Sequence, residues 1–516
     1  MGDKLARLSP FNNSYSQLYI ARPDFSNTVW SVLQRRDCLV VGAPAAGKTA
    51  FINELVKAKQ EQGLFARFSK EDYRDMWAAP TGESVHSRFA LALVAKFHDA
   101  ADAVETCKSL ASSLDSYERI LKRRKEPSTL EQIGEVARRV AEKTPEAIMP
   151  VVVLDDFDLL TSRLAPDRLN ALLEALFVLK GESSARIRFL LTSAIWPDDT
   201  WLRFLGRGKR EETESALEQL QRLSGSFETI LLPLLTEDQT RELGRLGLQQ
   251  LRDKEPVYVS NREGQITTLL NDHQANIWRF SGGHPLLVRK LYHYLLTQCD
   301  EQSWTVDWNR VVQTTREDKE VQQLVNRIRQ TLTRDQINVL RLAQAILSPD
   351  KYRRLPRDLR RAIDIERLPL RTLPPEIERL KIKTTDVLDS LARTGLLIRS
   401  ATEEERQQKE LYLLWVGDAK AYVPTARLLW EIFGEEVEAL RREYSIGERL
   451  AFWLVEHYPG WSLIQVLYYS AVVFFVLTAV ITYFGFSRWI ALPVLVPFLI
   501  YLLWTIIYQI LRRRRE

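Results

Sequence analysis

The segment GAPAAGKT, from Gly42 to Thr49, constrains the fold more than any other feature because it fits the pattern GxxxxGK[ST]. A short apolar run at 37–43 leads into it, and helix-forming residues follow from Lys48. Such glycines let backbone amides converge on phosphate oxygens, and the following helix directs its positive end at the same anion. The sequence therefore predicts a phosphate-binding loop between a strand and a helix, formed by Gly42, Ala43, Pro44, Ala45, Ala46, Gly47, Lys48 and Thr49.

Further apolar runs indicate the other strands of a sheet. They lie at 64–69, 148–158, 186–194 and 227–234, and a mostly helical stretch occupies about 83–145. Uninterrupted apolar strands that alternate with helices form parallel sheets covered on both faces. The expected fold class is therefore α/β, and the domain that contains the sheet and the phosphate-binding loop is expected over residues 1–235.

Acidic residues follow the third expected strand, in the segment VVVLDDFD that ends at Asp158. A magnesium-bound phosphate needs a carboxylate at the end of a neighbouring strand. We therefore expect Thr49 and Asp155 to ligate Mg²⁺, Lys48 to neutralise the β and γ phosphates of ATP or ADP, and Asp156 to orient water. A solvated helix N-cap is the alternative explanation of the acidic pair.

Hydroxyl groups end the fourth expected strand. Thr192 and Ser193 could sense the γ-phosphate of ATP, or they could form an ordinary turn at the strand end.

Four motifs together resemble the STAND class of P-loop ATPases, the signal-transduction ATPases with numerous domains, which are close to AAA+ proteins. LYIARPDF (18–25), the glycine loop, VVVLDDFD and FSGGHPLLVRKLYHYL (280–295) occur in the family's order and cover roughly residues 15–300. The resemblance implies a P-loop sheet of order 5-1-4-3-2, a helical lid at 236–330, Arg22 near the adenine or the lid, and Pro285 against the base. It also implies a switch that ADP holds closed and that ATP permits to form homo-oligomers. A protein could be the trigger, which the sequence does not identify.

Some residues depart from the family pattern. Many relatives carry an arginine directly after the fourth strand, where this chain has Ala194; Arg203, Arg207 or Arg210 could replace it. Asp156 stands where AAA+ motors carry Glu, and its shorter reach predicts slow hydrolysis. His284 has no His or Cys partner nearby in the sequence, so we expect a packed or capping residue rather than a metal ligand.

A winged-helix-like domain is expected at 331–434, from the order helix, helix, strand, strand. In STAND proteins this domain packs on the nucleotide site as a relay. DNA binding is the alternative, but the second helix carries Asp386 and Asp389, which repel phosphates, and only 351–361 is strongly basic.

The C-terminal region contains two long apolar runs, at 463–484 and 489–511, that lack Asp, Glu, Lys and Arg. Each is long enough to cross a hydrocarbon layer of about 30 Å. We therefore expect a transmembrane hairpin in residues 462–516, with a pair of buried soluble helices as the alternative. The amphipathic segment 435–461 is either a helix on the membrane surface or a plain linker.

The four arginines at 512–515 predict which side of the membrane carries the ends of the hairpin. By the positive-inside rule they lie in the cytoplasm. The expected location is therefore the plasma membrane, with two spans, lipid contact, and both termini and the ATPase domain cytoplasmic.

Composition narrows the functional classes further. The net charge of +5 is small for 516 residues, which argues against a general nucleic-acid coat. The three cysteines form no CxxC pair, so the sequence predicts no zinc site. The apolar runs and the family resemblance together imply a membrane-anchored ATP-dependent switch, by family analogy in bacterial defence or stress. The alternatives are a membrane-tethered regulator that binds DNA or a protein, and a scaffold that binds ATP without useful turnover.

Overall fold

A computed structural model describes most of the first 440 residues of the chain. The described ranges are 9–11, 18–79, 81–123, 130–182, 186–194, 210–300, 302–332, 334–347, 371–372, 384–393, 395, 397–408, 414–416 and 420–440. All of them except Leu440 fall in one compact unit, Met1–Leu355 with Ile363–Ala439. The second unit, Pro356–Ala362 with Leu440–Glu516, otherwise lies outside the described residues.

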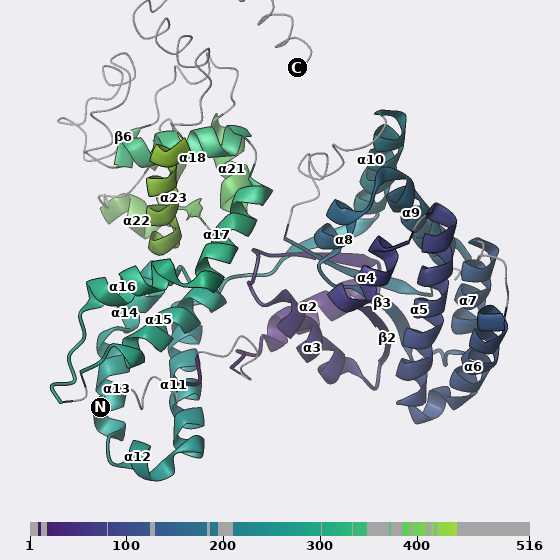
Figure 1. The fold of residues 1–516 in the computed structure, drawn as a ribbon, viewed down its shortest axis with the longest axis horizontal. Coiled ribbons are helices and arrows are strands. Elements are labelled where there is room, and N and C mark those ends of the chain that lie inside the picture. Colours follow the sequence, from purple (N-terminus) through teal and green to yellow (C-terminus); the bar gives the residue numbers. More distant parts are fainter. Residues whose placement is uncertain are drawn as a thin grey trace, which may run out of the picture. The chain divides into compact units, whose positions relative to one another are not determined.

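The first half of the chain forms a five-stranded sheet in which every pairing is parallel (Figure 1). The strands are β1 (Asp37–Val41), β2 (Gly63–Phe68), β3 (Met149–Leu154), β4 (Arg188–Ser193) and β5 (Phe227–Leu231). Their spatial order is β2-β3-β4-β1-β5, which from the other edge is the order 5-1-4-3-2 implied by the family resemblance. Because all strands run the same way, the segments that follow β1, β3 and β4 meet at one edge of the sheet.

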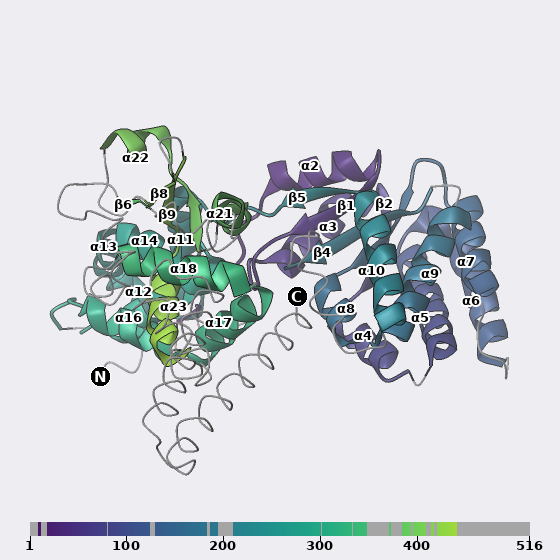
Figure 2. The ribbon, with the colours of Figure 1, turned by 90° about the horizontal axis from the view of Figure 1, so that it is seen from above.

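Alternate side chains of each strand enter two different apolar cores. On β1, Cys38 and Val40 join the core that contains α2 (Pro23–Leu33) and α3 (Lys48–Lys59), whereas Leu39 and Val41 join the core on the other face. That second core is covered by α4 (Lys70–Trp77), α5 (Gly82–Asp102), α6 (Lys108–Arg123), α7 (Leu130–Lys143), α8 (Phe157–Arg163), α9 (Pro166–Glu182) and α10 (Arg210–Gly225), with the short 3-10 helix η1 (Glu105–Cys107) (Figure 2). The prediction of a parallel α/β sheet covered on both faces is therefore confirmed.

Helical spacing of apolar residues explains the long insertion between β2 and β3. Leu110, Leu114, Tyr117 and Leu121 recur at intervals of three or four residues along α6, and all are buried. Such spacing places them on one face of a helix. Burying side chains of this size stabilises the fold by about 1.5–3 kcal/mol each relative to exposure, so the insertion folds against the sheet as helices.

The described residues of 237–331 are mostly helical, and the predicted lid with its bounds stays a prediction. The helices are α11 (Glu237–Lys254), α12 (Pro256–Ser260), α13 (Glu263–Asp272), α14 (Gln274–Ser281), α15 (Pro285–Thr297), α16 (Trp308–Glu317) and α17 (Lys319–Thr331). Thr236 caps α11 through a reciprocal bond with Gln239. Gly282 ends α14 in the left-handed conformation, and Pro285 begins α15.

The last described part combines helices with a small sheet. Its elements are α18 (Arg334–Leu347), β6 (Arg371–Thr372), α21 (Thr384–Arg393), β7 (Ile398–Ser400), α22 (Glu403–Gln408), β8 (Leu414–Val416), β9 (Lys420–Pro424) and α23 (Arg427–Leu440). The sheet order is β6-β8-β9-β7, and β9 pairs antiparallel with both β8 and β7. The expected order was helix, helix, strand, strand, whereas here β6 lies between α18 and α21, and α22 lies between β7 and β8. The winged-helix domain therefore stays a prediction.

Several predicted features lie outside the described residues. They are the two apolar runs, the terminal arginines, the basic segment 351–361 and most of 435–461. None of the helices in the described part combines the length and apolar character that crossing a membrane requires. The hairpin therefore stays a prediction.

Candidate nucleotide-binding site

The predicted phosphate loop connects β1 to α3. The Gly42 amide donates to the carbonyl of Ser193 at 3.0 Å, which ties the start of the loop to β4. Ala45 (φ 57°) and Gly47 (φ 94°) are both left-handed, and Gly47 is the N-cap of α3. The first amides of a helix have no acceptor inside it, and the N-cap residue of α3, Gly47, has no side chain to cap them. They are therefore available to an anion, which the positive end of α3 also favours.

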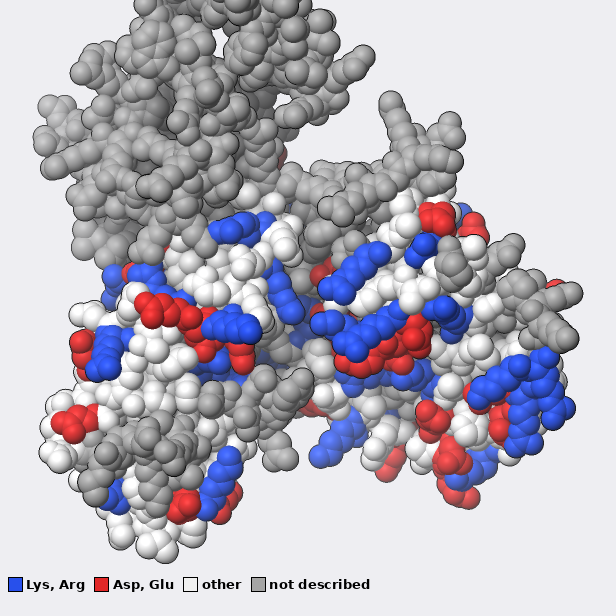
Figure 3. All heavy atoms as spheres, viewed as in Figure 1, with Lys and Arg blue, Asp and Glu red and all other residues white. Residues whose placement is uncertain are grey.

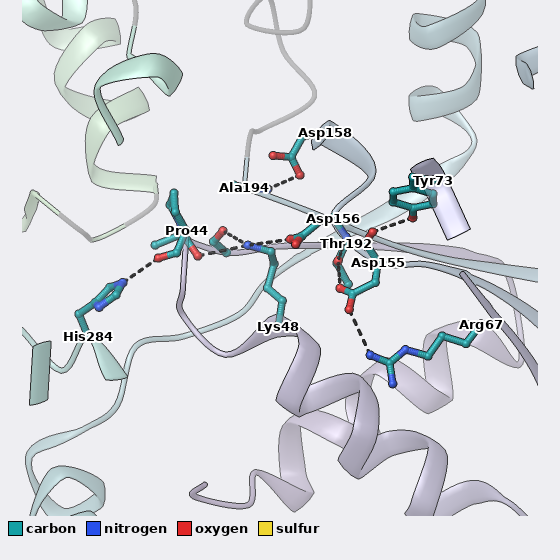
Figure 4. Close-up of polar contacts among 12 residues, drawn as sticks. Pro44, Lys48, Arg67, Tyr73, Asp155, Asp156, Asp158, Thr192, Ala194 and His284 are labelled. Carbon is teal, nitrogen blue, oxygen red and sulfur yellow. Dashed lines mark hydrogen bonds and ion pairs between the residues drawn. The ribbon is translucent and has the colours of Figure 1, made fainter. Parts of the chain in front are cut away.

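Lys48 lies inside the loop rather than in solvent. Its side chain is 4% exposed, and its ammonium donates to the carbonyls of Gly42 at 3.1 Å and Ala43 at 3.2 Å. The same nitrogen is 3.9 Å from a carboxylate oxygen of Asp156 (Figure 4). Thr49 is exposed at the next position of α3. The structure thus brings the predicted phosphate ligand and one predicted acid to the same place.

Asp155 is buried at the end of β3, where side chains from β4, β2 and α4 hold it. Thr192 donates its hydroxyl to one carboxylate oxygen at 2.8 Å, and the Arg67 guanidinium contacts the other at 3.3 Å. Tyr73 donates to the Asp155 backbone carbonyl at 2.6 Å. Burial, followed by the nearby acids, raises the pKa of Tyr73 well above its ordinary value, so this donor stays protonated. Arg67 and Tyr73 were not predicted as site residues.

The Thr192 hydroxyl serves both acids. Besides donating to Asp155, it accepts a hydrogen bond from the Asp156 amide at 2.8 Å, and Thr192 is fully buried. Thr192 lies within β4 rather than in a turn. Contact with the γ-phosphate stays a prediction, because the structure directs this hydroxyl to the acids.

Asp156 and Asp158 differ in environment although they share one turn. Asp156 is left-handed (φ 52°, ψ 50°) and N-terminal to α8, and its side chain is 41% exposed. Asp158 accepts from the Ala194 amide at 3.0 Å, and burial is the main cause of its raised pKa, which Asp156 also raises and Lys48 lowers. The half-exposed Asp156 could therefore hold a water molecule, whereas Asp158 holds the start of the segment that follows β4.

Arg22 connects its own segment, which precedes α2, to α3 and to the segment after β5. Its backbone amide donates to both carboxylate oxygens of Glu54 on α3, each at 3.1 Å, and its guanidinium donates to the carbonyl of Pro233 at 2.5 Å. Tyr19 donates to the same carboxylate at 2.7 Å. The pKa of Arg22 is lowered, chiefly by burial. Arg22 thus holds the segment after β5 against α3, and its predicted contact with adenine is not tested.

The lid motif reaches the phosphate loop through His284. This side chain is fully buried, and its Nε2 lies 2.8 Å from the carbonyl of Pro44. Burial lowers the pKa of His284 to about 4, so the ring is neutral, and Nε2 must carry the proton because a carbonyl only accepts. His284 is a packed residue, as expected. Pro285, the residue that was predicted to contact the base, is the first residue of α15.

The oxygen atoms of this edge suit a hard cation. Hydroxyl and carboxylate oxygens such as those of Thr49 and Asp155 are the ligands that Mg²⁺ takes beside phosphates. Among the candidates for a further arginine, Arg203 and Arg207 lie outside the described residues, and of Arg210 only the backbone, at the start of α10, is described.

Comparisons with known proteins return structures but no sequence family. No family model matches the chain, and no curated protein matches it. A Walker-type ATPase of Pyrococcus abyssi is similar over 80% of this chain and 96% of its own, with 12% identity and a TM-score of 0.41.

Two proteins of Aeropyrum pernix are also similar. Its ORC2 protein, in ADPNP and ADP complexes, covers 84% of this chain and 97% of its own, at 15% identity and a TM-score of 0.41. Its ORC1 protein, in complex with DNA, covers the same shares at 13% identity and a TM-score of 0.30. Because these TM-scores are below 0.5, the P-loop ATPase fold is assigned from the sheet and loop of this chain itself.

Proposed function

We propose that the chain is a membrane-anchored, ATP-dependent molecular switch of the STAND type. The observation that carries the proposal is the position of Lys48, whose ammonium lies among the loop carbonyls and 3.9 Å from Asp156. Asp155 is held beside it by Thr192 and Arg67. This arrangement supports binding of ATP or ADP with Mg²⁺, and slow hydrolysis.

Each side chain has a separate task in that chemistry. Lys48 neutralises phosphate charge, and the amides of the loop and of the first turn of α3 bind phosphate oxygens. Thr49 and Asp155 would hold Mg²⁺, which supplies further charge neutralisation when bound. Asp156 orients the attacking water and accepts its proton. The side chain of Asp156 is one methylene shorter than that of Glu, so its carboxylate reaches less far toward the water. This shorter reach supports slow turnover.

The switch proposal also draws on the rest of the chain. The lid (236–330) reaches the loop through His284, and a winged-helix-like domain (331–434) follows it. The uncharged runs at 463–484 and 489–511 support a transmembrane hairpin that contacts lipid, with the ATPase domain in the cytoplasm. In this proposal a protein trigger and ATP favour homo-oligomers, which gather hairpins and disrupt the membrane in bacterial defence or stress.

Binding of DNA is less well supported. On α21, Asp389 accepts from both Lys420 and Tyr422 of β9 at 2.6 Å, so this acid attaches the helix to the small sheet. Basic and acidic side chains are also interleaved over the described surface seen in Figure 3. Neither feature suits a helix that approaches phosphates.

Size measurements on the detergent-solubilised full chain test the proposal. We expect a larger species with Mg²⁺ and a non-hydrolysable ATP analogue than with Mg²⁺ and ADP. Lys48→Ala should weaken nucleotide binding roughly 10- to 150-fold, because a hydrogen bond to a charged group contributes about 1.5–3 kcal/mol. It should also abolish the size change.

Lys57→Ala is the matched control for Lys48→Ala. Lys57 lies on the same helix but is exposed in its last turn, so the variant should behave as the wild type. Equal sizes in the two nucleotides, or a size change that persists in Lys48→Ala, would contradict the proposed switch.

A further inference from the structure

The turn between α14 and α15, here called the lid turn, consists of Gly282, Gly283 and His284. Each of its residues contacts a different part of the chain. These parts are the phosphate loop, the segment after β5, and the start of α23.

The first contact joins the lid turn to the phosphate loop. His284 donates from Nε2 to the Pro44 carbonyl at 2.8 Å, inside a fully buried environment (Figure 4). The other ring nitrogen, Nδ1, is buried and has no hydrogen-bond partner among the described atoms. The imidazole is therefore held in place by its single polar contact with the loop, and not by a second bond within the lid.

The second contact joins the lid turn to the end of the ATPase core. Gly283 accepts at its carbonyl from the Leu235 amide at 2.9 Å, and its backbone is left-handed (φ 72°). A Cβ at this position would lie 1.9 Å from the Leu235 carbonyl oxygen. The two backbones are therefore packed against each other with no room for a side chain.

The third contact joins the lid turn to α23. A Cβ on Gly282, which is also left-handed (φ 57°), would lie 2.8 Å from the backbone nitrogen of Ala426. Beside it, the Arg427 guanidinium stacks over the ring of Phe280 at 5.0 Å. The last turn of α14 is thus in direct contact with the residues that begin α23.

These contacts connect the phosphate loop to α23 through the His284 side chain and the backbone of Gly282. Lys48 donates to the carbonyls of Gly42 and Ala43, which immediately precede Pro44. A Lys48 ammonium that turned to a phosphate would leave these carbonyls without their donor, and the loop backbone would then adjust. The tight glycine contacts cannot absorb such a shift as flexible side chains would, because packed backbone is stiff.

We propose that His284 is a positioning residue of the phosphate loop, through which the bound nucleotide sets the arrangement of α23. This inference rests on the proposed switch function and adds a route for its regulation. The helix α23 is followed in sequence by residues 441–516, so its arrangement is the point at which the nucleotide signal passes toward the C-terminal part of the chain.

Hydrogen exchange of the amides of 427–440 tests the inference in the detergent-solubilised full chain. It is measured with Mg²⁺ and ADP, and with Mg²⁺ and a non-hydrolysable ATP analogue. In the wild type, protection of these amides should differ between the two nucleotides. His284→Leu, which lacks a donor, should lose the difference while nucleotide affinity stays within about tenfold, since one net hydrogen bond is worth about that factor.

Two further variants separate positioning from folding. His284→Gln keeps an amide donor near the place of Nε2 and should restore the nucleotide-dependent difference. His293→Leu removes a buried histidine of α15, which contacts Ser9 at 2.9 Å instead of the loop, and should leave the difference intact. If His284→Leu does not fold, His284→Asn, whose amide is too short to reach Pro44, replaces it with the same expectation.

The outcomes distinguish this inference from the function on which it rests. If the wild type binds both nucleotides and the protection of α23 differs, but His284→Leu retains that difference, the role of His284 is refuted and the switch stands. A His293→Leu variant that also loses the difference refutes the specific role as well. If the wild type binds no nucleotide, or α23 does not respond to it, the proposed switch fails first.

Discussion

At the residue scale, the candidate site is a set of mutually satisfied polar groups rather than a row of free ligands. Asp155 receives hydrogen bonds on both carboxylate oxygens, and its backbone carbonyl receives another from Tyr73. Because unsatisfied buried polar groups are costly, each partner holds the acid in a defined orientation. The orientation of Asp155 and Asp156 therefore depends on neighbours from other strands and helices.

Thr192→Val tests this dependence. The substitution leaves a carboxylate oxygen of Asp155 and the amide of Asp156 without their shared hydroxyl, which should cost about 1–3 kcal/mol of stability. ATP hydrolysis and the Mg²⁺ dependence of nucleotide binding should be impaired beyond this loss of stability. Thermal unfolding, a phosphate-release assay and Mg²⁺ titrations of nucleotide binding measure the three effects.

Thr240→Val is the control for this substitution. Thr240 is equally buried and donates to the carbonyl of Thr236 in the lid, remote in sequence from the acids. Its variant should lose stability but keep hydrolysis. Equal hydrolysis by Thr192→Val and Thr240→Val would show that the Thr192 hydroxyl does not position the acids.

The site residues divide into those with a local sequence signal and those without one. Lys48 and Thr49 follow from a spacing within eight residues, and Asp155 from an acid at the end of an apolar run. Arg67 reaches Asp155 only because β2 pairs with β3, with Arg67 opposite Val153. No spacing in the sequence encodes that register, so Arg67 could not be predicted as a site residue.

At the element scale, the strands were predictable because they are short apolar runs, but their ends were not. The fifth strand was expected over 227–234, whereas β5 ends at Leu231. The strand order and the contacts of the lid turn depend on how distant segments pack. The periodicity of one sequence does not predict such packing. The strand order could be expected here only because the motifs resemble those of a known family.

Gly283→Ala tests the lid turn as a structural element. Alanine in the left-handed conformation costs about 1–2 kcal/mol, and the new Cβ would overlap the Leu235 carbonyl. We therefore expect a loss of at least about 2 kcal/mol of stability, visible as a lower melting temperature. Gly181→Ala is the control: on α9, near the helix end, it meets no atom within 4 Å, so its effect should be neutral or stabilising by up to about 1 kcal/mol. Similar melting temperatures for the two variants would contradict the tight backbone contact.

At the scale of the whole molecule, the described part of the chain has cores of its own. One apolar cluster includes Val40 of the large sheet, Leu287 of the lid and Leu429 of α23. A second cluster fills the other face of the sheet. Such continuous burial supports folding of the described residues independently of residues 441–516.

The two uncharged runs at 463–484 and 489–511 should therefore determine where the protein is found. Burying roughly 20 apolar residues per run in lipid is strongly favourable. We expect the full chain to remain with the membrane fraction after alkaline carbonate washing and to need detergent for release. A chain ending at residue 440 should stay in the supernatant and still bind nucleotide.

The control is a variant in which each arginine from Arg512 to Arg515 is replaced by Glu. It leaves both apolar runs intact and should therefore stay in the membrane fraction. A full chain that washes off with carbonate would show that the runs pack as soluble helices, because a peripheral protein is released by this treatment whereas a spanning hairpin is not.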